Sequence, residues 1–109
     1  KTVCGIENCF KFEQFLFDAF PQLGTMLPFG VIREEEFSPV KNAEGTDSPK
    51  TARTMIGKLH REWLVKAHVE VKPGKLYEVS PTISYAGEGL SRRVFERELG
   101  RNILEFEDA

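Results

Sequence analysis

One segment, residues 48–67, most limits how this chain can fold. Ser48 and Pro49 suit a helix start, because a serine hydroxyl caps free backbone N–H groups and proline fits the first helical position. Apolar residues then recur every three or four positions, which predicts an amphipathic helix with a basic opposite face. Such a helix must pack its apolar stripe against another element. The stripe consists of Ala52, Met55, Ile56, Leu59, Trp63, Leu64 and Ala67.

Residues before this helix predict two further elements. Phenylalanines and other apolar residues recur at helical spacing over residues 8–20, and Pro21 would end that helix. This helix would be apolar on nearly all sides, so a missing domain, a partner chain or a ligand must cover its second face. Residues 29–32 predict a strand that leads into the acidic run Glu34–Glu36. These carboxylates are interpreted as a solvated strand end, with a divalent cation site as the alternative.

The residues after the helix read as strands and loops. Val69 and Val71 alternate with polar residues, as do Tyr77 and Val79, and the Pro73-Gly74 pair between them predicts a hairpin. Another short strand is expected within residues 80–90, one or two helical turns within 91–99, and a terminal strand within 102–107. The predicted fold class is therefore α+β.

Composition excludes several classes of function. Fifteen Lys and Arg against 17 Asp and Glu give a net charge of −2 without a basic tract, so a nucleic-acid partner is not expected. No uncharged run reaches the ~20 residues that a membrane helix needs. Cys4 and Cys9 are too few for a disulfide scaffold or a zinc finger, which favours two reduced thiols, a reducing compartment and a cytoplasmic location, with a local disulfide between the two as the alternative. His60 and His68 are too far apart on one helix for joint metal binding, and a structural or solvent-exposed role is expected for both.

The loop between the acidic run and the long helix carries one lysine. Pro39 restricts its own φ and favours an extended conformation at Ser38, so the backbone that leads to Lys41 is predicted to be stiff. Lysine offers a compact positive charge on a long stem, which suits contact with a phosphate. Most lysines in polar loops are simply surface residues, and these residues alone do not decide between the two interpretations.

Four sequence blocks together resemble a known family. "FEQFLFDAF", "REEEFSPVKNAEG", "DSPKTAR" and "EVSPTISYAGEGL" occur over residues 12–90 in the order of the C-terminal region of the eukaryotic UDP-N-acetylglucosamine pyrophosphorylases, and residues 91–109 match poorly. The resemblance implies a C-terminal fragment of a nucleotidyltransferase that joins UTP to an N-acetylhexosamine 1-phosphate with the help of Mg²⁺. It implies that residues 1–67 belong to the catalytic domain and residues 68–109 to a small β-rich subdomain.

The same resemblance implies roles for individual residues. Lys41 matches the family's lysine that contacts the phosphates of the sugar nucleotide, as a catalytic and substrate-binding residue. Phe15 and Phe17 match two phenylalanines that border the sugar; helical geometry would turn Phe17 to the pocket and Phe15 to the core. The uridine-binding motif, the catalytic basic residue and the Mg²⁺ ligands belong to an N-terminal domain, so the isolated chain is expected to be inactive.

Two alternatives to this function stay open. One is a fragment of a related UDP-sugar pyrophosphorylase, such as one that acts on UDP-glucose. The other is a non-catalytic protein-interaction module with an exposed phenylalanine face. The short segment 70–78 stands where the family has a longer loop, so dimerisation through that loop is not expected. The isolated chain is instead expected to self-associate through its apolar first helix.

Overall fold

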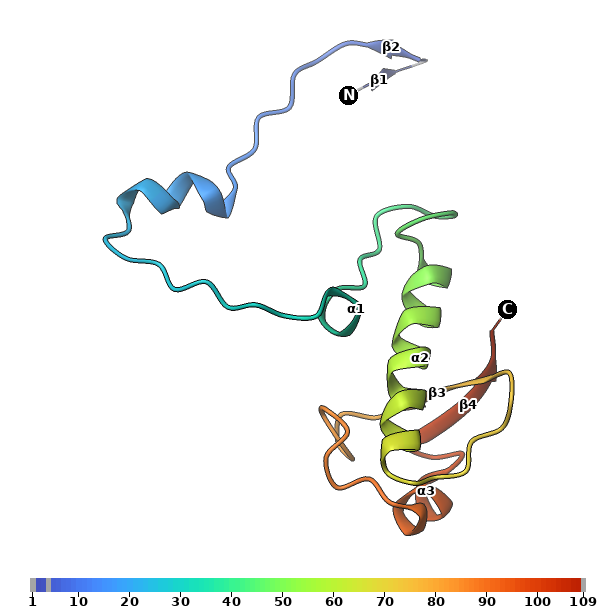
Figure 1. The fold of residues 1–109 in the computed structure, drawn as a ribbon. Coiled ribbons are helices and arrows are strands. Elements are labelled where there is room, and N and C mark those ends of the chain that lie inside the picture. Colours follow the sequence, from blue (N-terminus) through green and yellow to red (C-terminus); the bar gives the residue numbers. More distant parts are fainter. Residues whose placement is uncertain (1, 4, 109) are drawn as a thin grey trace. The chain divides into compact units, whose positions relative to one another are not determined.

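The structure is a computed structural model that describes residues 2–3 and 5–108. The chain divides into two compact units, Lys1–Gly30 and Val31–Ala109 (Figure 1). The chain contains helices as well as small antiparallel sheets, which confirms the predicted mixture of α and β structure. The predicted border between residues 67 and 68 concerns domains of a larger protein and stays a prediction.

The first unit contains little regular structure. Strands β1 (Thr2–Val3) and β2 (Ile6–Glu7) pair antiparallel, and the 3-10 helix η1 spans Leu16–Gln22. The side chain of Asp18 accepts the N–H of Phe15 at 2.8 Å, which fixes the start of η1. None of residues 5–30 is buried.

The predicted helix over residues 8–20 is wrong in its extent. Residues 8–15 are irregular, and Phe15 has extended φ and ψ angles of −111° and 162° at the N-cap of η1. A short helix is marginal in water unless its apolar face packs against something, and residues 5–30 provide no buried surface to support a longer one. The apolar side chains are instead exposed, for example Phe10 at 92% and Phe12 at 93%.

The strand predicted over residues 29–32 is also wrong. These residues are irregular and lead into α1 (Arg33–Glu36), a single helical turn. A strand needs a hydrogen-bonded neighbour, and neither sheet of the described residues offers one here. The side chains of Glu34–Glu36 are therefore spaced around one helical turn and do not alternate between two faces, as they would in a strand.

The second unit is built on the long helix that the sequence predicts. Helix α2 spans Pro49–Lys66 and packs on β3 (Lys75–Val79), which pairs antiparallel with β4 (Ile103–Glu107) (Figure 1). Between β3 and β4, the chain forms α3 (Arg92–Glu98), capped by the hydroxyl of Ser91. The helix and strand expected within residues 91–99 and 102–107 are thus confirmed. The core consists of Leu64, Val69, Tyr77, Val79 and Ile103.

The hairpin predicted around Pro73-Gly74 is wrong, because β3 pairs with β4 and not with residues 69–71. Those residues serve to end α2. His68 has a left-handed φ of 57°, the N–H of His68 bonds to Val65 O, and the N–H of Val69 bonds to Leu64 O at 2.9 Å. This is a Schellman motif, which satisfies the last carbonyls of the helix and places Val69 in the core.

The strand expected within residues 80–90 is replaced by turns. Ile83 N and Ser84 N both bond to Ser80 O, at 2.9 and 3.2 Å. Pro81 lacks a backbone N–H and does not fit a central strand, whereas it is compatible with these turns. Within these turns, the side chain of Ile83 packs against the core.

Candidate functional site

The loop that carries Lys41 is attached to helix α2 where it begins. Ser38 is half-buried, and its hydroxyl donates a hydrogen bond to Ala52 O at 3.3 Å and lies 3.9 Å from Met55 Sδ. Pro39 next to it is also half-buried. The stiff approach to Lys41 that the sequence predicts is therefore supported by contacts to a rigid helix.

The backbone at Lys41 is held by hydrogen bonds within the loop. The N–H groups of Lys41 and Asn42 both donate to Asp47 O, at 2.7 and 3.0 Å. The side-chain amide of Asn42 donates to Thr46 O at 2.7 Å. The side chain of Lys41 is exposed, and no residue in the described part of the chain forms an ion pair with it. A fixed main chain thus carries a cation that is open to a ligand.

The far end of the loop is fixed by the N-cap of α2. Ser48 is only 1% exposed, and its hydroxyl donates to Gly45 O at 2.7 Å while accepting the N–H of Thr51 at 3.4 Å. The N–H of Ser48 donates in return to the Thr51 hydroxyl at 2.9 Å. This reciprocal pair has the form of a capping box, with threonine in place of glutamate. The predicted Ser-Pro helix start is confirmed. It also closes the lysine loop, which consists of residues 37–48 between α1 and α2.

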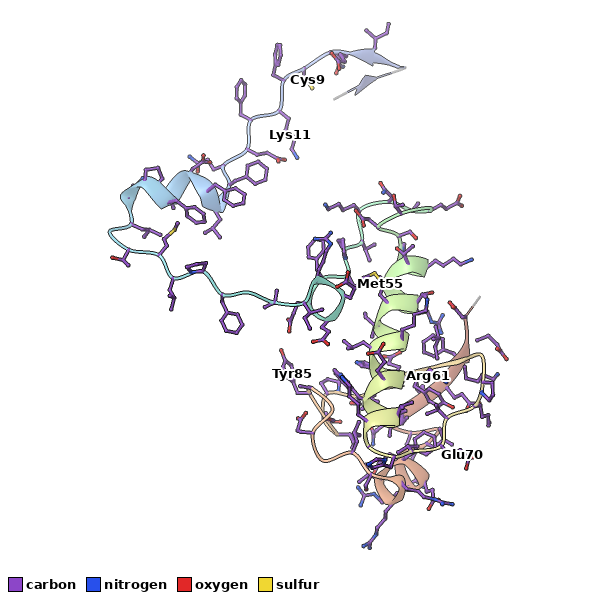
Figure 2. All side chains as sticks on the ribbon, in the orientation of Figure 1. Cys9, Lys11, Met55, Arg61, Glu70 and Tyr85 are labelled. Atoms are coloured by element: carbon purple, nitrogen blue, oxygen red, sulfur yellow. The ribbon has the colours of Figure 1, made fainter. Side chains whose placement is uncertain are left out.

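A groove of about 410 Å³ lies between α1 and α2. Its apolar lining comes from Ile32, Met55 and Leu59, and its rim is charged. Met55 is labelled on α2 in Figure 2. The carboxylates of Glu34 and Glu35 border the groove, and all residues of α1 are exposed. Within residues 2–3 and 5–108, no group of three His, Cys, Asp or Glu residues is placed to hold a metal ion.

Phe15 and Phe17 belong to the first unit, whereas the loop that carries Lys41 belongs to the second. They are 61% and 70% exposed, and the ring of Phe17 meets that of Phe20 edge to face with centroids 5.3 Å apart. The expectation that one faces a pocket and the other a core depended on a helix that would include both. Because Phe15 precedes η1, that reason is lost, and the role of each phenylalanine at a sugar stays a prediction.

The loop at residues 84–90 has an organisation that the sequence interpretation missed. The carboxylate of Glu88 accepts hydrogen bonds from the Ser84 hydroxyl at 2.9 Å, Tyr85 N at 2.8 Å and Ala86 N at 2.6 Å. These hydrogen bonds stabilise the charged carboxylate and lower the pKa of Glu88 to about 2, and the bond from the backbone N–H of Tyr85 contributes most. A glutamate between two glycines, a few residues after a serine, was the available signal. The loop presents Tyr85, which is 81% exposed (Figure 2).

The two histidines have structural roles, as expected. His60 Nδ1 accepts the N–H of Val79 at 3.1 Å, and its ring lies against Trp63 with centroids 4.5 Å apart. Burial lowers the pKa of His60, and the nearby charge of Glu78 partly opposes this change. His68 follows the C-cap of α2 and takes part in the Schellman motif, through its left-handed φ and its N–H bond to Val65 O. Cys9 is exposed, and Cys4 lies outside the described residues, so the redox state expected for the two thiols stays a prediction.

No helix within the described residues is both long and apolar enough to cross a membrane. A scan against models of known protein families found no match, and no solved structure matched the chain.

Proteins from several eukaryotes are similar to this chain. It is 46% identical over 87 residues to UDP-N-acetylglucosamine diphosphorylase 2 of Arabidopsis thaliana, a match that covers 73% of this chain and 17% of the relative. UDP-N-acetylglucosamine pyrophosphorylase of Saccharomyces cerevisiae is 45% identical over 98 residues, which are 83% of this chain and 20% of the relative. UDP-N-acetylhexosamine pyrophosphorylase-like protein 1 of Homo sapiens is 35% identical over 121 residues, 93% of this chain and 24% of the relative. The chain thus spans about a fifth of the length of these relatives, in their C-terminal region.

Proposed function

Since this chain is homologous to the C-terminal region of the eukaryotic UDP-N-acetylglucosamine pyrophosphorylases, we propose that it forms one wall of the active site of such an enzyme. The complete enzyme would join UTP to N-acetylglucosamine 1-phosphate. An oxygen of the sugar phosphate attacks the α-phosphorus of UTP, the bond between the α- and β-phosphates breaks, and pyrophosphate leaves with the electron pair. The product is UDP-N-acetylglucosamine.

The observation that carries this proposal is the lysine loop. The loop is rigid at its backbone and exposes an ammonium group without an ion-pair partner in the described residues, as a phosphate-binding group requires. Lys41 would lie against the phosphates of the sugar nucleotide and balance their negative charge, which is the main catalytic task in transfer at phosphorus. Phe17 and Phe15 would border the sugar and its acyl group.

The rest of the catalytic apparatus would come from the remainder of the enzyme. Mg²⁺ is implied by the resemblance, but the described residues include no group of three His, Cys, Asp or Glu that could hold it, so its ligands would belong to the remainder of the enzyme. The isolated chain is therefore proposed to be inactive, with the large N-terminal part of the enzyme as its partner. A cytoplasmic location and a place in amino-sugar metabolism follow from the same proposal.

Among the alternatives, a UDP-glucose pyrophosphorylase is supported less well. The names of the relatives specify N-acetylglucosamine or N-acetylhexosamine. Activity of the complete protein with N-acetylglucosamine 1-phosphate and with glucose 1-phosphate separates the two functions. A clear preference for glucose 1-phosphate would favour the alternative. A complete protein that releases no pyrophosphate with either sugar would favour the interaction module.

Lys41→Ala in the complete enzyme tests the role of the lysine. A hydrogen bond to a charged group contributes about 1.5–3 kcal/mol, so kcat/KM should fall roughly 10- to 150-fold. The melting temperature should not change, because the Lys41 side chain is exposed. Lys66→Ala, an exposed lysine at the other end of α2, is the matched control and should retain activity. Parallel losses of thermal stability and activity in Lys41→Ala would instead make this lysine structural.

A further inference from the structure

A single carbonyl oxygen holds the main chain at Lys41. Asp47 O accepts the N–H groups of both Lys41 and Asn42, so the chain folds back on itself over residues 41–47. Asp47 adopts a left-handed φ of 51° and Gly45 one of 77°, which make this reversal possible. The orientation of the Lys41 Cα–Cβ bond therefore depends on the closure of this loop.

Within residues 41–47, all of which the structure describes, only the side chain of Asn42 forms a hydrogen bond to another residue of the segment. Its amide Nδ2 donates to Thr46 O at 2.7 Å, next to the residue whose carbonyl accepts the two backbone N–H groups. The side chain of Asn42 thus fixes the position of Thr46 and, through it, the direction of the Asp47 carbonyl. Asparagine suits this place because its short side chain offers an N–H donor without a charge. An aspartate would set a carboxylate against the Thr46 carbonyl oxygen, and both groups only accept hydrogen bonds.

The loop is also fastened to α2 on both sides. Ser38 bonds to Ala52 O, and Ser48 bonds to Gly45 O while it caps the helix. These anchors fix the ends of the loop, whereas Asn42 fixes its middle, where the lysine is. We propose that Asn42 is a positioning residue for Lys41. Its hydrogen bond to Thr46 O holds the backbone at Lys41 so that the side-chain ammonium group can contact the phosphates of the sugar nucleotide. This proposal rests on the phosphate-contacting role proposed for Lys41.

The experiment is a double-mutant cycle in the complete enzyme, with Asn42→Ala, Lys41→Ala and the double variant. Asn42 is exposed, so the truncation leaves no buried group without a partner. A misplaced contact weakens transition-state binding, and Asn42→Ala should lower kcat/KM about 10-fold. If Asn42 acts only through Lys41, the same substitution should have no further effect in the Lys41→Ala background. Asn102→Ala is the matched control: it removes an equivalent exposed amide bond, from Asn102 Nδ2 to Glu98 Oε2 at 2.8 Å, and should retain activity.

A second measurement does not depend on activity. In this 109-residue chain, amide hydrogen exchange should show the N–H groups of Lys41 and Asn42 protected, and Asn42→Ala should remove that protection while the amides of α2 stay protected. Unchanged protection at Lys41 in the variant would overturn the proposal, because the loop would then close without Asn42. Loss of protection throughout α2 would make Asn42 a residue of the fold in general and would overturn it as well.

The outcomes separate the two proposals. If Lys41→Ala keeps full activity, the phosphate role of Lys41 is wrong, and a positioning role toward it falls too. If Lys41→Ala loses activity but Asn42→Ala does not, or if Asn42→Ala lowers activity equally in both backgrounds, the positioning role alone is wrong. Both proposals are supported if Asn42→Ala lowers kcat/KM when Lys41 is present and has no effect on kcat/KM in the Lys41→Ala background.

Discussion

Gly57 lies where helix α2 meets the sheet, and the structure predicts that Gly57→Ala destabilises the protein. Gly57 is buried, and a Cβ atom added there would lie 2.8 Å from Leu76 Cβ and 2.9 Å from Phe106 Cζ. Leu76 and Phe106 are directly paired residues of β3 and β4. The added methyl group would therefore push against both strands of the sheet at once.

The magnitude follows from two opposing effects. In a helix interior, alanine is more favourable than glycine by about 1 kcal/mol. Overpacking a well-packed core costs roughly 1–3 kcal/mol, and the upper half of that range applies here because Leu76 Cβ is bonded to the backbone and cannot rotate away. The net loss of unfolding free energy should be about 1–2 kcal/mol. For a domain of this size, the melting temperature should fall by about 5–15 °C.

Thermal unfolding of the 109-residue chain, followed by circular dichroism at low protein concentration, measures this change. Gly30→Ala is the matched control, since it adds the same methyl group where no atom lies within 4 Å, and its melting temperature should equal that of the unchanged chain. A melting temperature for Gly57→Ala that is unchanged or higher would refute the reasoning. It would mean that helix propensity outweighs the contact, and hence that α2 can move off the sheet at little cost.

Three further predictions concern other parts of the chain. The hydrogen bonds to Glu88 hold its pKa at about 2, below the ordinary value of 4.5. The contribution of its carboxylate to the free energy of unfolding should therefore be complete above pH 4.5 and be lost as the pH falls toward 2. In acid unfolding experiments, Glu88→Gln should lack this loss of stability between pH 4.5 and 2. His68 occupies a left-handed conformation that favours glycine, so His68→Gly should raise the free energy of unfolding by about 1 kcal/mol in urea titrations, and an unchanged midpoint would contradict this. The isolated chain should self-associate through the exposed apolar side chains of residues 10–29, and light scattering that shows a monomer at high concentration would argue against it.

Helices α2 and α3 and the last strand, β4, follow from local patterns. Ser48 and Pro49 start α2, apolar spacing carries it to Lys66, and alternation marks β4, because capping chemistry and periodicity depend only on neighbours in the chain. The resemblance to the pyrophosphorylases was also visible in four short blocks and is confirmed by the relatives. The stiff backbone before Lys41 follows from Pro39, since proline restricts φ whatever surrounds it.

Contacts between distant residues decided the rest. A turn at Pro73-Gly74 suggests a hairpin, but β3 gains a longer partner in β4, and His68 directs Val69 into the core instead. Residues 8–15 have helical spacing, yet a helix needs a surface to pack on, and none of residues 5–30 is buried. The lysine loop shows both effects. Pro39 restricts the backbone conformations that lead to Lys41, whereas the hydrogen bond from Lys41 N to the carbonyl of Asp47, six residues further on, selects one of them. Local sequence sets which conformations a segment favours, and the tertiary structure selects among them because burial and hydrogen bonding are satisfied over the whole chain at once.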